Sequence, residues 1–281
     1  MKTKLIMIEG LPGFGKSTTA QLVHNILGEL NIETKLFLEG NVEHPADFEG
    51  MAYYTKDGFE QLVSSCDAKL SRMLIDEVTN KGDDYFLPYR KMKKALGSDL
   101  PDALFHEMMK NDIYELPLGQ HIELITGKWD EFAKKTLVGN EVYVFECCFI
   151  QNPVTMGMVK CGAPKEKVIN YVMRLAEIIE CLNPVLLYIN QTDLAFSFKK
   201  AIKERPKEWS DGFIDYYTSQ GYGKALGFKG LEGTLRVLEA RKELEAEIYD
   251  MLQMQKRKID NSEYVIDKYR GELVEILKDY V

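Results

Sequence analysis

Of the 281 residues of the chain, 45% are hydrophobic and 28% are charged, which is the composition of a globular protein. The length suits one large α/β domain or a domain with an insertion. Its net charge of −8 argues against general binding to nucleic acid or to an anionic membrane, because both favour a basic surface. The five cysteines are odd in number and form no C-x-x-C pair, which argues against a disulfide framework or a zinc site and leads us to expect a cytoplasmic protein.

The first predicted element is a short buried strand at residues 5–8, followed by a glycine-rich loop and a helix. Residues 10–17, GLPGFGKS, match the phosphate-binding pattern G-x-x-x-x-G-K-[ST] without a mismatch. Glycines let backbone N–H groups turn toward an anion, and the start of a helix adds unpaired N–H groups and a favourable dipole. We therefore predict that this P-loop binds a nucleoside triphosphate, with Lys16 on the β- and γ-phosphates and Ser17 on Mg²⁺. The residues expected to hold the nucleotide are Gly10, Gly13, Phe14, Gly15, Lys16, Ser17 and Thr18.

Further strands are expected at residues 34–38, 141–145, 184–189 and 256–259. Most of these segments are continuous apolar runs separated by helices, which is typical of a parallel sheet covered on both faces. Together with the first strand they predict the α/β fold of a P-loop NTPase, with three layers and a mostly parallel five-stranded sheet.

Roughly a hundred residues separate the second and third predicted strands, far more than a crossover needs. Helical spacing at residues 59–78 and 101–114 predicts a helical insertion, which we place at 51–138 within a core of 1–50 and 139–281. Ligands of open α/β sheets bind at the carboxyl edge, so this insertion is expected either to form the wall of an acceptor pocket or to be a structural cap. Its aromatic residues could clamp an acceptor or form a small core.

Residues 196–230 follow the fourth predicted strand and combine basic side chains with glycines. This composition suits a lid that closes on phosphates, while a solvated basic helix followed by a flexible loop is the alternative. The basic residues of this segment are Lys199, Lys200, Lys203, Arg205, Lys207, Lys224 and Lys229. The long helix that comes next repeats apolar residues at Val237, Leu244, Ile248 and Met251, which predicts core packing.

Two acidic residues follow predicted strands. Glu146 ends the third strand, where a carboxylate can hold Mg²⁺ beside Ser17. Glu39 ends the second strand, where a carboxylate can accept a proton from an attacking hydroxyl. The alternative for Glu39 is a helix-capping or surface carboxylate.

This order of a P-loop, two strand-end acids and a basic segment resembles the P-loop kinases of the nucleoside and nucleotide kinase group, in particular deoxynucleoside kinases and thymidylate kinases. The resemblance covers the core strands and not the insertion. It implies ATP and Mg²⁺ as cofactors, Glu39 as a general base, Glu146 as a magnesium ligand, and a lid arginine that Arg205 matches best. The chain departs from the pattern at Cys147, where these families commonly place an arginine, and in its lid, where lysines replace most arginines.

The expected function is an ATP- and Mg²⁺-dependent kinase that transfers the γ-phosphoryl group to a hydroxyl or phosphate of a small molecule. A nucleoside or nucleotide is one candidate acceptor, and a sugar, vitamin precursor or antibiotic is another. The alternative is a P-loop ATPase switch that acts on a protein partner. Residues 190–193, NQTD, lack the lysine of the guanine-binding N-K-x-D pattern, which favours ATP over GTP. We expect no nucleic-acid or membrane partner, and a homodimer stays open.

Overall fold

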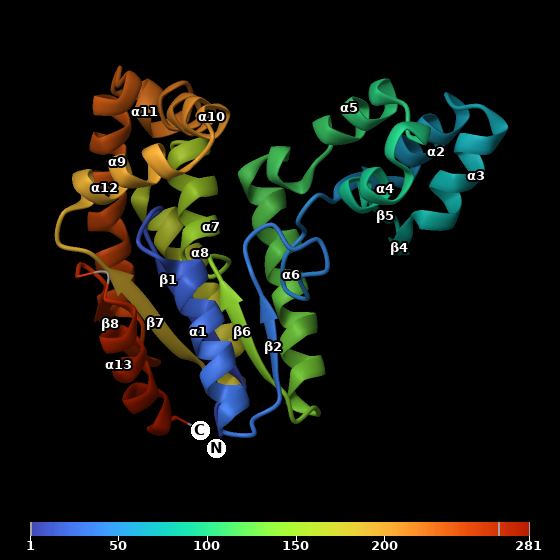
Figure 1. Cartoon of the computed structure of the whole chain (residues 1–281). Coiled ribbons are helices and arrows are strands. Elements are labelled where there is room, and N and C mark those ends of the chain that lie inside the picture. Colours follow the sequence, from blue (N-terminus) through green and yellow to red (C-terminus); the bar gives the residue numbers. More distant parts are fainter. Residues whose placement is uncertain (1, 264, 281) are drawn as a thin grey trace. The chain divides into compact units, whose positions relative to one another are not determined.

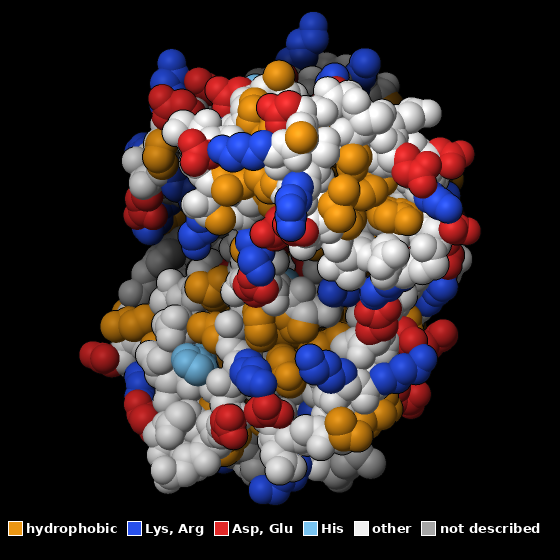
Figure 2. Space-filling view, turned by 90° about the vertical axis from the view of Figure 1, so that its right-hand side faces the viewer, with side chains coloured by type: hydrophobic (Ala, Val, Ile, Leu, Met, Phe, Trp, Pro, Cys, Tyr) orange, Lys and Arg blue, Asp and Glu red, His pale blue; other side chains and the backbone are white. Residues whose placement is uncertain are grey.

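The computed structural model describes residues 2–263 and 265–280 (Figure 1). The chain forms two compact units, the first made of Met1–Glu39 and Thr126–Val281 and the second of Gly40–Ile125. Among the described residues, no helix combines the length and the apolar character that crossing a bilayer requires. Basic and acidic side chains are interspersed over the face shown in Figure 2, so charge of neither sign dominates what is visible there.

The first unit is built on a five-stranded parallel sheet, as the apolar runs predict. Its strands are β1 (Leu5–Gly10), β2 (Thr34–Phe37), β6 (Val142–Glu146), β7 (Val185–Asn190) and β8 (Gln255–Asp260). The strand order is β2-β6-β1-β7-β8 with every neighbouring pair parallel, so β1 lies at the centre and is buried along its whole length. Ile8 of β1 pairs with Glu146 of β6, and Gly10 pairs with Ile189 of β7. This register brings the start of the P-loop to the edge where β6 and β7 end.

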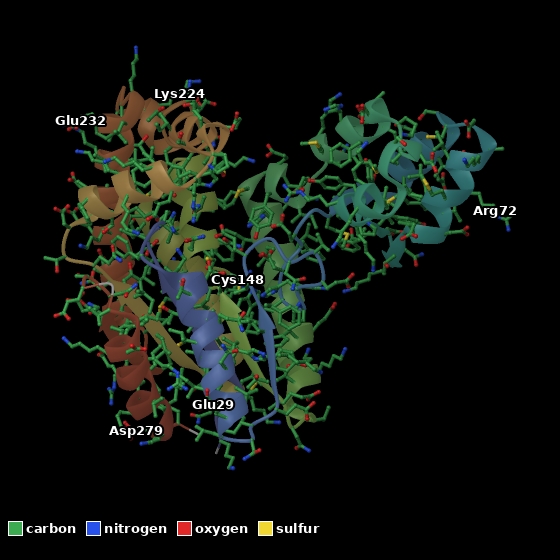
Figure 3. All side chains as sticks on the ribbon, viewed as in Figure 1. Glu29, Arg72, Cys148, Lys224, Glu232 and Asp279 are labelled. Atoms are coloured by element: carbon green, nitrogen blue, oxygen red, sulfur yellow. The ribbon has the colours of Figure 1, made fainter. Side chains whose placement is uncertain are left out.

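Helices surround this sheet. They are α1 (Lys16–Glu29), α7 (Gln151–Val154), the π-helix η3 (Thr155–Lys160), α8 (Lys165–Ile179), η4 (Glu180–Leu182), α9 (Leu194–Glu204), α10 (Lys207–Thr218), α11 (Gly221–Ala225), α12 (Gly230–Met251) and α13 (Ile266–Lys278). Helix α1 packs against β1, β2 and β6, and α13 packs against α1 on the near face of the sheet in Figure 1. Glu29 at the end of α1, labelled in Figure 3, pairs with Arg270 of α13 at 2.5 Å.

Helix α12 packs against α8, α9 and α10 and so supports the segment predicted to be a lid. Its residues Val237, Leu244 and Ile248 are buried, as their spacing predicts. Met251 is 43% exposed, so the prediction of core packing is wrong there, because the helix ends at this residue and the chain turns away.

The second unit contains a three-stranded antiparallel sheet in addition to helices. Its strands, in the order β3-β5-β4, are β3 (Ala52–Thr55), β4 (Thr79–Lys81) and β5 (Asp84–Leu87), and its helices are α2 (Lys56–Ser64), α3 (Ala68–Glu77), α4 (Tyr89–Leu96), η1 (Gly97–Asp99), α5 (Asp102–Lys110) and η2 (Ile113–Glu115). The side chain of Asp67 caps α3, which divides the single helix expected at 59–78. The sequence did not indicate the small sheet, because strands of three or four residues are too short to show an alternating pattern.

The boundary between the units lies within α6 (Leu118–Leu137). Trp129 in the second half of this helix is fully buried, and its ring lies 5.9 Å from that of Phe145 on β6. Phe132 contacts the same strand, with its ring 4.9 Å from that of Phe145. The second half of α6 therefore belongs to the unit with the parallel sheet. The second compact unit spans Gly40–Ile125, whereas the predicted insertion spans 51–138.

Candidate functional site

The glycines of the P-loop have conformations that other residues rarely adopt. Gly10, Gly13 and Gly15 have φ values of 142°, 86° and 90°. A Cβ on Gly10 would lie 2.5 Å from the carbonyl oxygen of Ile189, and one on Gly15 would lie 2.5 Å from the amide Nδ2 of Asn261. The loop is thus fixed by close approach to β7 on one side and to the residue after β8 on the other.

Lys16 begins helix α1 and folds back over the loop. Its side chain is buried, and its Nζ donates to the carbonyl oxygen of Leu11 at 3.1 Å. The ammonium group therefore lies above the loop, where a bound anion would meet both the lysine and the backbone N–H groups at the start of α1.

The predicted magnesium residues touch each other. Ser17 Oγ donates to Glu146 Oε1 at 2.5 Å, and the other oxygen, Oε2, accepts the backbone N–H of Glu39 at 3.2 Å. Glu146 is buried at the end of β6. A hydroxyl and a carboxylate are hard oxygen ligands of the kind that Mg²⁺ prefers, so the residues present fit this ion.

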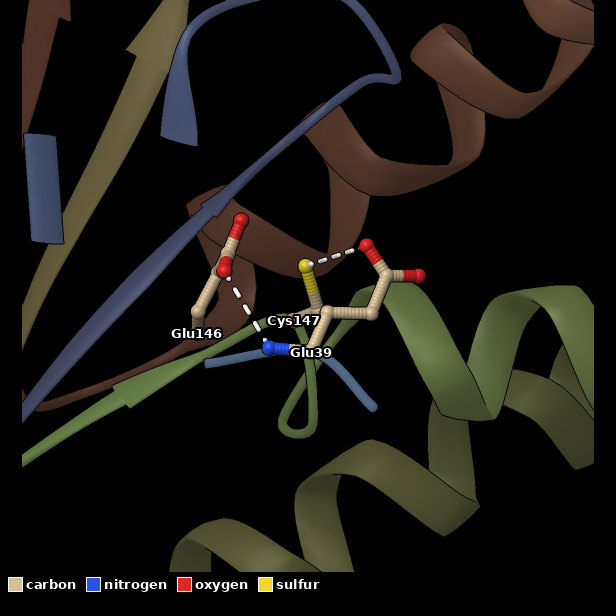
Figure 4. Close-up of side chains that lie close together, drawn as sticks. All are labelled: Glu39, Glu146 and Cys147. Atoms are coloured by element: carbon tan, nitrogen blue, oxygen red, sulfur yellow. Dashed lines mark hydrogen bonds between the residues drawn. The ribbon is translucent and has the colours of Figure 1, made fainter. Parts of the chain in front are cut away.

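Glu39 lies two residues beyond β2 and is exposed. One carboxylate oxygen accepts a hydrogen bond from Gln151 Nε2 at 3.1 Å. The other accepts one from Cys147 Sγ at 3.6 Å, which Figure 4 shows. Burial raises the pKa of the Cys147 thiol well above its usual range, so the thiol is protonated and donates. The structure therefore brings Glu39 and Glu146 together, with Cys147 between them.

A cavity of about 890 Å³ opens over the P-loop in the first unit. Its lining includes the predicted site residues Gly13, Gly15, Lys16, Ser17, Thr18, Glu39, Glu146 and Arg205. Gly10 and Phe14 do not line it. Phe14 points into the hydrophobic core, and its part in the loop is its carbonyl oxygen, which accepts a hydrogen bond from Asn261 Nδ2 at 3.0 Å.

The segment at 196–230 forms most of one wall of this cavity. Of its basic residues, Lys200 and Arg205 are the ones that line the cavity within the described chain, and Lys200 also pairs with Glu204 at 2.7 Å. The guanidinium of Arg205 stacks over the ring of Trp209 at 4.2 Å. Helix α10 adds three more aromatic residues to the lining, Phe213, Tyr216 and Tyr217.

Arg241 of α12 also lines the cavity, and the sequence interpretation did not include it. It is fully buried and donates to Glu245 Oε1 at 2.6 Å, to Tyr217 Oη at 2.5 Å and to Thr155 Oγ1 at 2.9 Å. Burial lowers the pKa of this arginine, but the facing Tyr217 and Glu245 outweigh burial and leave the pKa raised. Its position on the apolar stripe of α12, four residues after Val237, is the signal that could have revealed it.

Glu9, directly before the P-loop, is a second buried charge that the sequence did not single out. Its carboxylate accepts backbone N–H bonds from Phe149 at 2.8 Å and from Gln151 at 2.9 Å. Burial raises its pKa to about 7, against the lowering effect of these bonds, and the nearby Glu245 adds to the rise. Glu9 therefore fixes the loop after β6 to the strand that carries the P-loop.

A glycine loop between a central parallel strand and a helix, with an acid at the end of the neighbouring strand, defines a P-loop α/β fold. No family model matches the chain, and no curated protein matches it. Among solved structures, the thymidylate kinase of Candida albicans is similar with a TM-score of 0.44 and 15% sequence identity, over 99% of this chain and 92% of that one.

Proposed function

We propose that the protein is an ATP-dependent phosphotransferase that moves the γ-phosphoryl group to a hydroxyl or phosphate group of a small molecule. The observation that carries this proposal is the position of Glu39, whose carboxylate lines the same cavity as the P-loop and lies beside the Ser17–Glu146 pair. A P-loop alone accounts for nucleotide binding, whereas an additional carboxylate beside the magnesium residues suits activation of an acceptor.

Each group has a defined task in this proposal. Backbone N–H groups of the P-loop and Lys16 bind the β- and γ-phosphates, and Arg205 neutralises charge on the transferring group. Ser17 and Glu146 would hold Mg²⁺, which would supply positive charge against the negative charge of the phosphates. Glu39 orients the acceptor hydroxyl and takes its proton. Closure of the segment at 196–230 would exclude water, which competes as acceptor.

The first experiment is a screen that identifies the acceptor. The aromatic side chains of Trp209, Phe213 and Tyr216 in the cavity suit a planar ring, so nucleosides and nucleoside monophosphates come first in the screen, followed by sugars and vitamin precursors. The screen measures the thermal stability of the protein with Mg²⁺ and a non-hydrolysable ATP analogue, because a ligand of the folded state raises the apparent stability.

The decisive variants are Lys16→Ala and Glu39→Gln. We expect Lys16→Ala to abolish ATP turnover, and Glu39→Gln to bind ATP normally while transfer to the acceptor falls by about 100-fold or more. Undiminished transfer by Glu39→Gln would overturn the assignment of the base. ATP hydrolysis that responds to a protein partner, and to none of the small molecules, would instead support the ATPase switch.

A further inference from the structure

The carboxylate of Glu39 is at the end of an exposed side chain in the segment that follows β2. The backbone N–H of this residue donates to Glu146 Oε2 at 3.2 Å, which fixes the main chain and leaves the side chain to rotate. A long side chain at the surface loses conformational entropy when it is held in one rotamer. Proton transfer from an acceptor requires a defined position of the carboxylate, so the groups that hold it matter for the reaction.

Gln151 and Cys147 both donate to this carboxylate, and the amide is the stronger donor. Gln151 Nε2 lies 3.1 Å from Glu39 Oε1, an ordinary length for a hydrogen bond. Cys147 Sγ lies 3.6 Å from Oε2, and a thiol is a weak donor (Figure 4). Oε1 is therefore the oxygen that the protein holds, and Oε2 is the oxygen that an acceptor hydroxyl could take over from the thiol.

Gln151 is itself held by buried residues on both sides of its backbone. It begins α7 and is 6% exposed. Its N–H donates to Glu9 Oε2 at 2.9 Å, and its carbonyl oxygen accepts a longer bond of 3.4 Å from Arg241 Nη2. Glu9 and Arg241 are both buried, and Arg241 is fixed in turn by Glu245. The amide that reaches Glu39 thus extends from a rigid part of the core.

We propose that Gln151 is a positioning residue, which holds Oε1 of Glu39 and so leaves Oε2 to accept the proton of the acceptor hydroxyl. This role rests on the proposed function, in which Glu39 is the base. In the transfer step the acceptor oxygen bonds to the γ-phosphorus, the bond from that phosphorus to the bridging oxygen of ADP breaks, and the hydroxyl proton moves to Oε2. Gln151 acts through Glu39 alone, so its loss should lower kcat and leave substrate binding unchanged.

A double-mutant cycle tests this role, because it separates an effect through Glu39 from a general effect on the fold. Gln151→Met keeps the approximate size of the side chain and removes the donor. With the acceptor found in the screen, we expect it to lower kcat by about tenfold or more, while KM for the acceptor and the affinity for an ATP analogue stay within about threefold. In the Glu39→Gln background the same substitution should cause less than about a twofold further loss.

Gln191→Met is the matched control, because Gln191 is also buried and its Nε2 donates to the backbone carbonyl of Asn261 at 3.3 Å. Any effect that it has on kcat should be the same in both backgrounds. Gln151→Glu is the second variant if Gln151→Met does not fold. It keeps the length of the side chain, and its ionised carboxylate cannot donate, so we expect the same pattern.

Two results would overturn the role of Gln151 alone. One is an active wild-type protein in which Gln151→Met keeps kcat within about twofold. The other is an equal loss from Gln151→Met in both backgrounds, as a purely structural residue would give. Wild-type protein that transfers phosphate to no small molecule would overturn the proposed function itself, and the role of Gln151 with it.

Discussion

The hydroxyl of Ser17 donates a 2.5 Å hydrogen bond to Glu146, which joins the first turn of α1 to the end of β6 across 129 positions of the sequence. The pair exists because β6 lies beside β1 in the sheet, with Glu146 level with Ile8. We expect Ser17→Ala and Glu146→Gln each to weaken Mg²⁺-dependent binding of an ATP analogue by roughly tenfold or more. The double variant should lose less than the sum of the two single losses, because in the proposed function both residues hold one ion. Titration calorimetry with and without Mg²⁺ checks this, and fully additive losses would argue against a shared ion.

Arg205 and Lys199 give a matched pair for testing which basic residues of the segment at 196–230 reach phosphate. Arg205 lines the cavity and stacks on Trp209, whereas Lys199 is exposed and does not line it. If Arg205 contacts the transferring group as proposed, Arg205→Ala should lower kcat by about 100-fold or more, because such an arginine contributes at least that much in phosphoryl transfer. Lys199→Ala should keep kcat within about twofold, as expected for a surface charge. Equal losses in steady-state assays of the two variants would contradict the assignment.

Arg241 and Glu245 predict a large effect on stability. Both side chains are fully buried, so Arg241→Met leaves the charge of Glu245 without its cationic partner, although the hydroxyl of Tyr188 still donates to it at 2.7 Å. We expect the free energy of unfolding to fall by about 3–5 kcal/mol. Arg236→Met on the same helix is the control, because the exposed Arg236–Glu232 pair should contribute less than about 1 kcal/mol. Urea unfolding measures the stability of Arg241→Met, of Arg236→Met and of the double variant Arg241→Met/Glu245→Gln. The double variant has no unpaired buried charge, so its loss of stability reports the loss of packing, and the further loss in Arg241→Met reports the broken ion pair.

Glu9 predicts a pH dependence of stability. Burial raises its pKa from an ordinary value of 4.5 to about 7, so between these values the folded chain binds a proton that the unfolded chain has released. The free energy of unfolding should therefore fall as pH rises from 4.5 to about 7. Once the pH is above this window, the total loss should be about 3 kcal/mol. Glu9→Gln does not titrate, so unfolding at about pH 5 and about pH 8 should show a smaller difference for this variant. An identical difference in both proteins would mean that another group controls it.

The parts of the fold that follow from local constraints could be predicted from sequence. The P-loop was recognisable because its glycines, Lys16 and Ser17 keep a spacing that phosphate binding requires. The central strands were recognisable because β1, β6 and β7 are buried on both faces and read as unbroken apolar runs. The edge strand β8 is mostly exposed, yet its position before Asp260 was also found.

Other parts depend on tertiary contacts that no local pattern contains. Arg241 and Glu9 are ionisable residues that are buried against partners far away in the chain. These partners are Tyr217 and Thr155 for the arginine and Phe149 for the glutamate. The boundary within α6 depends on the contact of Trp129 with β6, and a helical pattern alone does not indicate which half of a helix belongs to which unit.

The bond from Glu9 to the backbone of Gln151 bears on how the proposed phosphotransferase could come to accept a different substrate. Glu9 is covalently adjacent to Gly10, so insertions or deletions in the stretch at 147–151 would disturb the strand that carries the phosphate loop. New preferences would be acquired more readily through α10, whose aromatic side chains line the same cavity without a bond to Glu9. Directed evolution for a different acceptor should therefore accumulate its first productive substitutions between residues 209 and 217.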